Sequence, residues 1–203
     1  MTAEPPECRA VRALLAPSDE RLRFDGGSVV EGPAGAWQVI PWPLGFDEAP
    51  DVFIVGPLRG NDPEALVRVA DIPGRGFTVL RGLEPLKALL AAYPKLAPKT
   101  IAALVAVSLG PQGGERVLVG AEVDDALDER AAEVPTALRT LDFRAFTGGG
   151  WTLAFLTSRL HKQPPDTHWR HTVARWHAAL TANGILTWRR EVVLENVLLA
   201  RYA

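Results

Sequence analysis

Four histidines lie close together near the C-terminal end of the chain, and their side chains could do chemistry. All the histidines of the 203-residue chain fall within 17 residues, and four of the six tryptophans lie near them. Histidine titrates near neutral pH, ligates metal ions and contacts phosphate groups. The cluster therefore indicates a working surface, with an ordinary amphipathic segment as the alternative. Its members are His161, His168, His171 and His177.

Metal binding is the first chemistry that such a cluster suggests. His168 and His171 are three residues apart, so on a helix both side chains can reach one ion. A zinc site usually needs three or four protein ligands, however, and the single cysteine, Cys8, lies far away in the sequence. The His-Glu-x-x-His pattern of zinc proteases is absent. We therefore expect neither a metal ion nor another cofactor.

No residue receives a catalytic role from the sequence. The acidic residues from Glu122 to Glu129 follow a predicted strand, where carboxylates can hold magnesium. The solvated first turn of a helix explains the same residues more simply. Gly148–Gly150 resembles no phosphate-binding motif and is better explained as a hinge. The chain also lacks the Gly-x-Ser-x-Gly pattern of hydrolases.

The histidines belong to a segment that we predict to be a helix over residues 167–182. Apolar residues recur there at helical spacing, and Asn183-Gly184 follows as a stop signal. One stripe contains Trp169, Val173, Trp176 and Leu180, the opposite side carries His168, His171 and Arg175, and Arg170 and His177 lie on a flank.

After this helix we predict a hairpin over residues 185–202. The matching string runs from His171 to Leu186, HTVARWHAALTANGIL, and is followed by the basic pair Arg189-Arg190. Together, helix and hairpin resemble the second half of a winged-helix DNA-binding domain. By this resemblance, residues 135–146 and 151–161 form the two preceding helices. The resemblance covers less than a third of the chain.

The resemblance implies a non-enzymatic protein that contacts DNA through its helix and hairpin. A recognition helix places polar side chains in the major groove, where an arginine such as Arg175 can contact guanine. Arginines on the hairpin would contact phosphates. The implied nucleic-acid-binding residues are His168, Arg170, His171, Arg175, Arg189 and Arg190.

The distribution of charge also indicates the C-terminal part of the chain as the binding region. Residues 1–145 carry 15 basic and 21 acidic residues, whereas residues 146–203 carry 7 and 3. A positive region on an acidic protein suits a polyanion or an acidic partner. Statistical drift in composition is the alternative explanation.

The whole chain is expected to be an α+β protein. We place a β-rich and helical portion at residues 1–134 and a helical module ending in a β-hairpin at residues 135–203; a single domain is the alternative. Predicted helices span 7–16, 61–70, 83–93, 100–109 and 124–133, and predicted strands span 21–24, 28–30, 36–41, 51–56, 76–80 and 116–123.

Two other functions fit the same sequence. One is a protein-interaction module, such as an adaptor, an assembly factor or an immunity-type protein. The other is an enzyme with an unrecognised site near His168 and His171. The aromatic-proline cluster around Trp37 and Trp42 is either a contact surface or a corner of the core.

The sequence also leads to expectations about where the protein is found in the cell and how it assembles. With one cysteine and no apolar segment at the N-terminus, we expect a cytoplasmic protein without a membrane partner. The exposed hairpin at the C-terminal end could pair with a second copy to form a homodimer.

Overall fold

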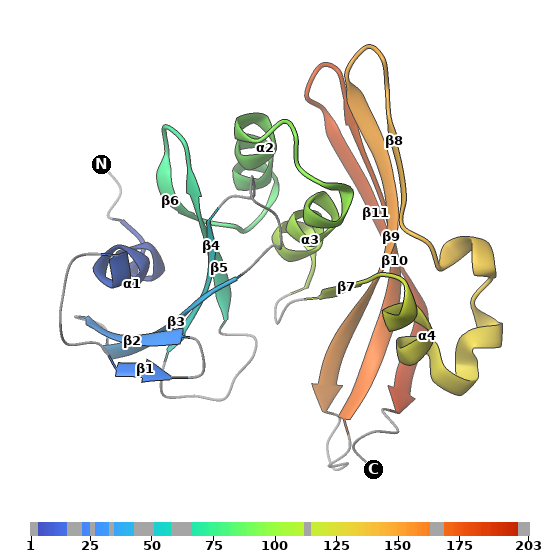
Figure 1. Ribbon diagram of the computed structural model, residues 1–203, viewed down its shortest axis with the longest axis horizontal. Coiled ribbons are helices and arrows are strands. Elements are labelled where there is room, and N and C mark those ends of the chain that lie inside the picture. The colour runs from blue at the N-terminus through green and yellow to red at the C-terminus, as the bar shows by residue number, and fades with distance from the viewer. Residues whose placement is uncertain are drawn as a thin grey trace. The chain divides into compact units, whose positions relative to one another are not determined.

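The computed structural model describes residues 4–15, 22–24, 27–32, 35–42, 51–57, 66–111, 115–162 and 169–198 (Figure 1). The chain forms two compact units. The first comprises residues 1–100 and 107–114, and the second comprises residues 101–106 and 115–203. The predicted boundary after residue 134 therefore falls inside the second unit.

The first unit is built on a six-stranded sheet in which each strand pairs antiparallel with the next. Short apolar runs separated by glycine, proline and aspartate favour such a meander, because the turn residues let the chain reverse after each strand. The strands are β1 (Leu22–Phe24), β2 (Gly27–Gly32), β3 (Gly35–Pro41), β4 (Val52–Pro57), β5 (Val67–Ile72) and β6 (Gly76–Val79).

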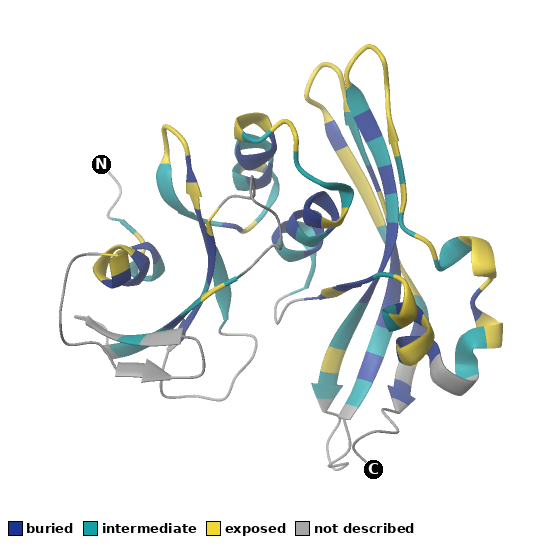
Figure 2. Ribbon diagram, in the orientation of Figure 1, coloured by how far each residue is buried: buried dark blue, intermediate teal, exposed yellow. Residues whose placement is uncertain are grey.

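Helix α1 (Pro6–Leu15) covers one face of this sheet. Its buried side chains Cys8, Val11 and Leu14 pack into one core with Val55 and Val69 of the sheet. The unit also contains α2 (Leu83–Ala92), whose leucine stripe is buried, and the two ends of α3 (Pro98–Leu109). Figure 2 shows the buried inner side of α1 and its exposed outer side.

Three long strands dominate the second unit: β9 (Gly150–Lys162), β10 (Trp169–Thr181) and β11 (Leu186–Leu198). They form an antiparallel meander with β11 at one edge. The other edge of β9 pairs with two short strands in succession, β7 (Arg116–Leu118) and β8 (Asp142–Ala145). Each long strand is 13 residues, so the sheet is much longer than the helices beside it (Figure 1).

The helical segments that follow β7 cover part of one face of this sheet. Helix α4 (Ala121–Leu127) and the 3-10 segment η2 (Asp128–Glu133) contribute Val123, Leu127 and Ala131 to a core with side chains of the sheet. The covered side chains of the sheet are Leu118, Leu156, Val173, Leu194 and Val197. We call this side of the sheet the α4 face.

Glycines occupy the turns of two hairpins of the second unit, β8–β9 and β10–β11. Gly150 has a φ of 84° at the start of β9, and a Cβ there would lie 2.3 Å from the Leu180 carbonyl oxygen. Gly184 has a φ of 74° in the loop between β10 and β11. Both positions require a residue that tolerates positive φ, and glycine does so without strain. Gly148 and Gly149 thus belong to the turn between β8 and β9, and Gly150 is the first residue of β9.

The α+β class is confirmed, but the helical C-terminal module is wrong. Residues 169–181 of the predicted helix 167–182 form β10, and residues 151–161 lie in β9. Residues 135–146 contain only the short 3-10 helix η3 (Thr136–Leu138) and strand β8. The predicted hairpin 185–202 is also wrong as placed, since 186–198 is one strand that pairs with β10.

In the first unit, the predictions for β1 to β4, β6 and helices α1 to α3 are confirmed within a few residues. The predicted helix 61–70 is wrong where the structure describes it, because residues 67–70 belong to β5. The predicted strand 116–123 ends after Leu118, and α4 begins at Ala121.

Candidate functional site

Arg175, the residue expected to contact guanine, has a structural role in the fold. The residue is 4% exposed on the α4 face of β10. Its guanidinium donates hydrogen bonds to the carbonyl oxygens of Leu138 and Thr140, the latter at 2.9 Å. Burial lowers the pKa of Arg175, and the nearby Asp142 opposes this shift. The side chain therefore anchors the segment before β8 to the sheet.

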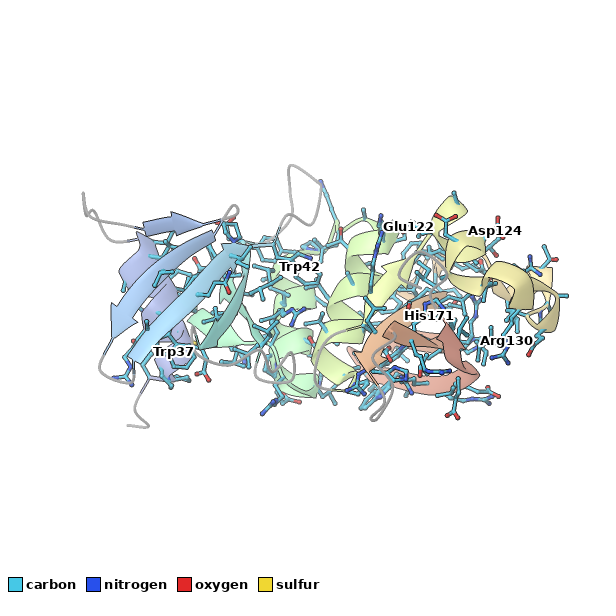
Figure 3. All side chains as sticks on the ribbon, turned by 90° about the horizontal axis from the view of Figure 1, so that it is seen from below. Trp37, Trp42, Glu122, Asp124, Arg130 and His171 are labelled. Atoms are coloured by element: carbon cyan, nitrogen blue, oxygen red, sulfur yellow. The ribbon has the colours of Figure 1, made fainter. Side chains whose placement is uncertain are left out.

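His171 is likewise part of the interior. It is 3% exposed, and its Nδ1 lies 3.1 Å from the Ser158 hydroxyl on the neighbouring strand. Figure 3 shows His171 on the sheet, with Glu122 and Asp124 on α4. These two acids have structural partners, because Glu122 pairs with Arg116 and Asp124 lies 3.7 Å from Arg139.

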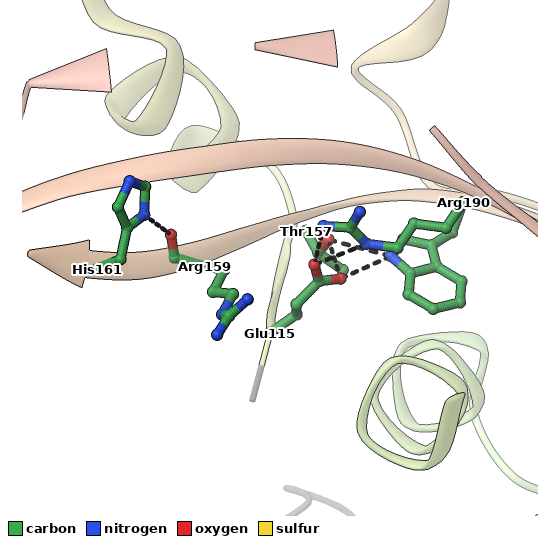
Figure 4. Close-up of polar contacts among 6 residues, drawn as sticks. Glu115, Thr157, Arg159, His161 and Arg190 are labelled. Carbon is green, nitrogen blue, oxygen red and sulfur yellow. Dashed lines mark hydrogen bonds and ion pairs between the residues drawn. The ribbon is translucent and has the colours of Figure 1, made fainter. Parts of the chain in front are cut away.

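Arg190 belongs to a buried polar network on the face opposite to the α4 face. Its guanidinium pairs with the carboxylate of Glu115, whose side chain is 0% exposed. The same carboxylate accepts hydrogen bonds from Thr157 Oγ1 at 2.7 Å and Trp176 Nε1 at 2.8 Å (Figure 4). Because these partners come from β9, β10 and β11, the carboxylate joins three strands. The network satisfies a charge that would otherwise be costly to bury.

The six residues predicted to bind nucleic acid therefore do not form one surface. Arg175, His171 and Arg189 lie on the α4 face, whereas Arg170 and Arg190 lie on the opposite face. Arg189 is well exposed and pairs with Glu191 on its own strand. His168 lies outside the described residues. Nucleic-acid binding itself stays a prediction, but the helix that was to present these side chains is a strand.

The register of four strands places a different set of residues together on the α4 face, beyond the part that α4 covers. One row across the sheet has Asp142, Ala154, His177 and Arg189, and the next row has Arg144, Thr152, Ala179 and Thr187. Small side chains occupy the middle of both rows except at His177. These residues, together with Arg175, line a hollow of about 560 Å³, which we call the polar hollow.

The polar hollow carries positive charge. Three arginines and one aspartate line it. Partial burial lowers the pKa of His177, and the positive charges of Arg175 and Arg189 lower it further, while Glu191 opposes the shift. His177 is therefore mostly neutral at pH 7, because its pKa lies below the usual 6.5. The arrangement can hold an anionic group over a floor of alanine and threonine side chains.

Most residues of the polar hollow were missed in the sequence, although two signals were present. Residues 151, 153 and 155 are Trp, Leu and Phe, and such alternation with smaller residues indicates a strand. Asp142 and Arg144 also alternate with apolar neighbours. The cross-strand register, which brings Arg144 and Arg189 to opposite sides of one hollow, leaves no signal in the sequence.

The aromatic residues of the first unit belong partly to its core. Trp37 packs against the cluster beneath α1, and the Arg68 guanidinium lies 5.8 Å from the centre of the Trp42 ring. These contacts favour the interpretation of the Trp37 and Trp42 cluster as a corner of the core rather than a contact surface.

No family model, curated protein or solved structure matches this chain. In the part of the chain that the structure describes, no group of three or more metal-ligating side chains is found. The helices among the same residues are all too short or too polar to cross a bilayer.

Proposed function

We propose that this chain is a protein-binding module that holds an acidic segment of its partner in the polar hollow. The observation that carries the proposal is the excess of arginine around an uncovered hollow of about 560 Å³. Binding pockets of roughly 300–1,000 Å³ accommodate small ligands or a few side chains. The volume therefore suits a short stretch of acidic residues.

The two exposed arginines of the polar hollow are available to a ligand. Arg144 pairs with Asp142, and Arg189 pairs with Glu191, in each case two residues away on the same strand. The arginine side chains are 73% and 71% exposed. Exposed ion pairs of this kind are worth only about 0–1 kcal/mol, so a carboxylate of a partner can replace them at little cost.

Exposed apolar side chains near the polar hollow favour a protein over a nucleic acid. Phe146 is 52% exposed beside the turn between β8 and β9, and Ile185 is 58% exposed beside the turn between β10 and β11. These turns adjoin, because a Cβ at Gly149 would lie 3.7 Å from Ala182. Aromatic and apolar anchors beside charged groups are typical of protein interfaces.

The proposal is tested by titrating the protein with fluorescein-labelled hexaglutamate, hexalysine and hexathymidylate and measuring fluorescence anisotropy. Hexaglutamate is expected to bind at low salt and to be released as salt screens the charges. Ala179→Trp fills the floor of the polar hollow and should weaken this binding by about tenfold or more. The matched control is Asn183→Trp, which places the same side chain on an exposed turn.

The same titrations distinguish a protein partner from a nucleic-acid partner. Failure of hexaglutamate to bind at about 20 mM salt would overturn the proposal. Binding of hexathymidylate alone, sensitive to Ala179→Trp, would favour nucleic acid instead. Binding of hexaglutamate that is indifferent to Ala179→Trp would place the interaction elsewhere and would equally contradict the assigned site.

A further inference from the structure

Strand β11 presents an unpaired edge with a defined pattern of backbone groups. Among the described strands, β11 pairs only with β10. The Thr181 amide donates to the Ile185 carbonyl oxygen, which makes this closing pair hydrogen-bonded. Such pairs alternate along an antiparallel ladder. Residues 187, 189 and 191 therefore bond to β10, and residues 188, 190 and 192 direct their amides and carbonyls outward.

We infer that β11 pairs antiparallel with β11 of a second copy of this chain, in a register centred on Arg190. An unpaired edge strand is a ready template for another strand. If a two-fold axis perpendicular to the sheet passes between the two β11 strands, each face of one sheet continues into the same face of the other sheet. Outward-facing residues then meet outward-facing residues, and registers centred on Arg189, Arg190 or Glu191 all satisfy this condition.

The charges on β11 select among these registers. Centring on Arg189 places two exposed arginines opposite each other, and centring on Glu191 places two exposed glutamates opposite each other. Like charges directly across a ladder destabilise it. Centring on Arg190 instead places Arg189 opposite Glu191 of the second copy, and does so twice. These are non-hydrogen-bonded pairs, in which side chains approach most closely.

The side chains on the other face of β11 agree with this register. Trp188 falls opposite Val192 of the second copy, again twice. Both side chains are exposed and apolar, at 44% and 38%, and aromatic residues beside β-branched residues stabilise antiparallel pairs. At the centre the two Arg190 residues meet, but each already pairs with the buried carboxylate of Glu115. Their repulsion is therefore reduced.

The pairing has a natural end on the C-terminal side. Arg130 of η2 donates a hydrogen bond to the Glu195 carbonyl oxygen, at 3.0 Å. The Arg130 side chain thus occupies the edge just beyond residue 194. The pairing of β11 with β10 shifts register between residues 192 and 194. The shared ladder therefore covers residues 188–192 of each copy, and the Arg130 contact lies outside it.

Charge reversal at the two residues tests this register through analytical ultracentrifugation of the full chain. Arg189→Glu makes both positions negative, and Glu191→Arg makes both positive. Each variant alone is expected to raise the dissociation constant of the dimer by about tenfold or more. Mixing the two variants should restore dimers, because the two negative side chains of one copy then face the two positive side chains of the other. The double exchange in one chain should also restore them.

The control is Arg75→Glu, which reverses the charge of an exposed arginine in the turn between β5 and β6 and should leave the dimer intact. Circular dichroism establishes that each variant is folded. A wild-type chain that remains monomeric at about millimolar concentration would overturn the inference. So would dimers that persist equally in both single variants, or single variants that stay monomeric when mixed. The readout is the oligomeric state, so it does not depend on hexaglutamate binding in the polar hollow.

Discussion

His177 of β10 and Arg189 of β11 lie directly opposite each other on the α4 face of the sheet, beyond the part that α4 covers. The arginine contributes to holding the pKa of His177 below its usual 6.5, after partial burial and the charge of Arg175. The histidine is thus a neutral member of a positive site at pH 7. This relationship makes the charge of the polar hollow dependent on pH.

Hexaglutamate binding should strengthen in mild acid. As pH falls below 6.5, His177 gains a proton and adds positive charge to the polar hollow, while the glutamates of the peptide, with a pKa of about 4.3, stay ionised. Anisotropy titrations between about pH 7.5 and pH 5.5 measure the effect. His177→Gln should abolish the dependence, and an equal dependence in that variant would refute this role.

The same shift predicts a small loss of stability in acid. The pKa of His177 is lowered in the folded state, so the unfolded chain binds the proton more readily. The stabilising contribution is present above about pH 6.5 and is lost as pH falls toward the folded-state pKa. Urea denaturation at several pH values should show a smaller decrease for His177→Gln than for the wild type.

Glu115→Gln should destabilise the second unit. The change removes the charge that pairs with Arg190 and weakens the acceptor for Thr157 and Trp176. Removing one partner of a buried ion pair costs about 3–5 kcal/mol, and partial exposure of Arg190 puts the expected loss at about 2–3 kcal/mol. Urea denaturation measures the difference. Glu133→Gln, on the exposed part of η2, is the control and should leave stability nearly unchanged, because exposed ion pairs contribute little.

Gly150→Ala should be far more harmful than Gly148→Ala, although the two glycines are only two residues apart, in the turn before β9 and at the first residue of β9. At Gly150 the positive φ and a Cβ 2.3 Å from the Leu180 carbonyl oxygen both oppose a side chain. At Gly148 nothing lies within 4 Å of the added carbon. We expect a loss of about 2 kcal/mol or more for the first and little change for the second. Equal melting temperatures for the two variants would contradict this account.

Cys8 should react slowly in the folded protein. Burial against the first sheet, together with Glu4 and Glu7, raises the pKa of its thiol from 9.0 to about 11. The thiolate is the reactive form, so at pH 8 its population falls by roughly 100-fold. Alkylation by iodoacetamide, followed by mass spectrometry, should be slow in buffer and fast in urea. Rapid alkylation of the native chain would show that α1 does not shield the thiol.

The sequence by itself determined most of the first unit. Turn residues bracket short apolar runs there, so that β1 to β4 can be placed without tertiary information. In α2 the spacing of Leu86, Leu89 and Leu90 marks one buried face. In these segments the local sequence is enough to predict the secondary structure, because the turn residues and the helical spacing of the leucines each fit one kind of element.

Only the tertiary structure decided the second unit. Trp169, Val173, Trp176 and Leu180 match a helical stripe, yet Ala174, Trp176, Ala178 and Leu180 alternate equally well along a strand. Pairing with β9 and β11 along the whole length of β10 selects the strand. The polar hollow depends on the same pairing, because Asp142, His177 and Arg189 become neighbours only through cross-strand register. Register is a relation between distant segments, and no local pattern of residues specifies it.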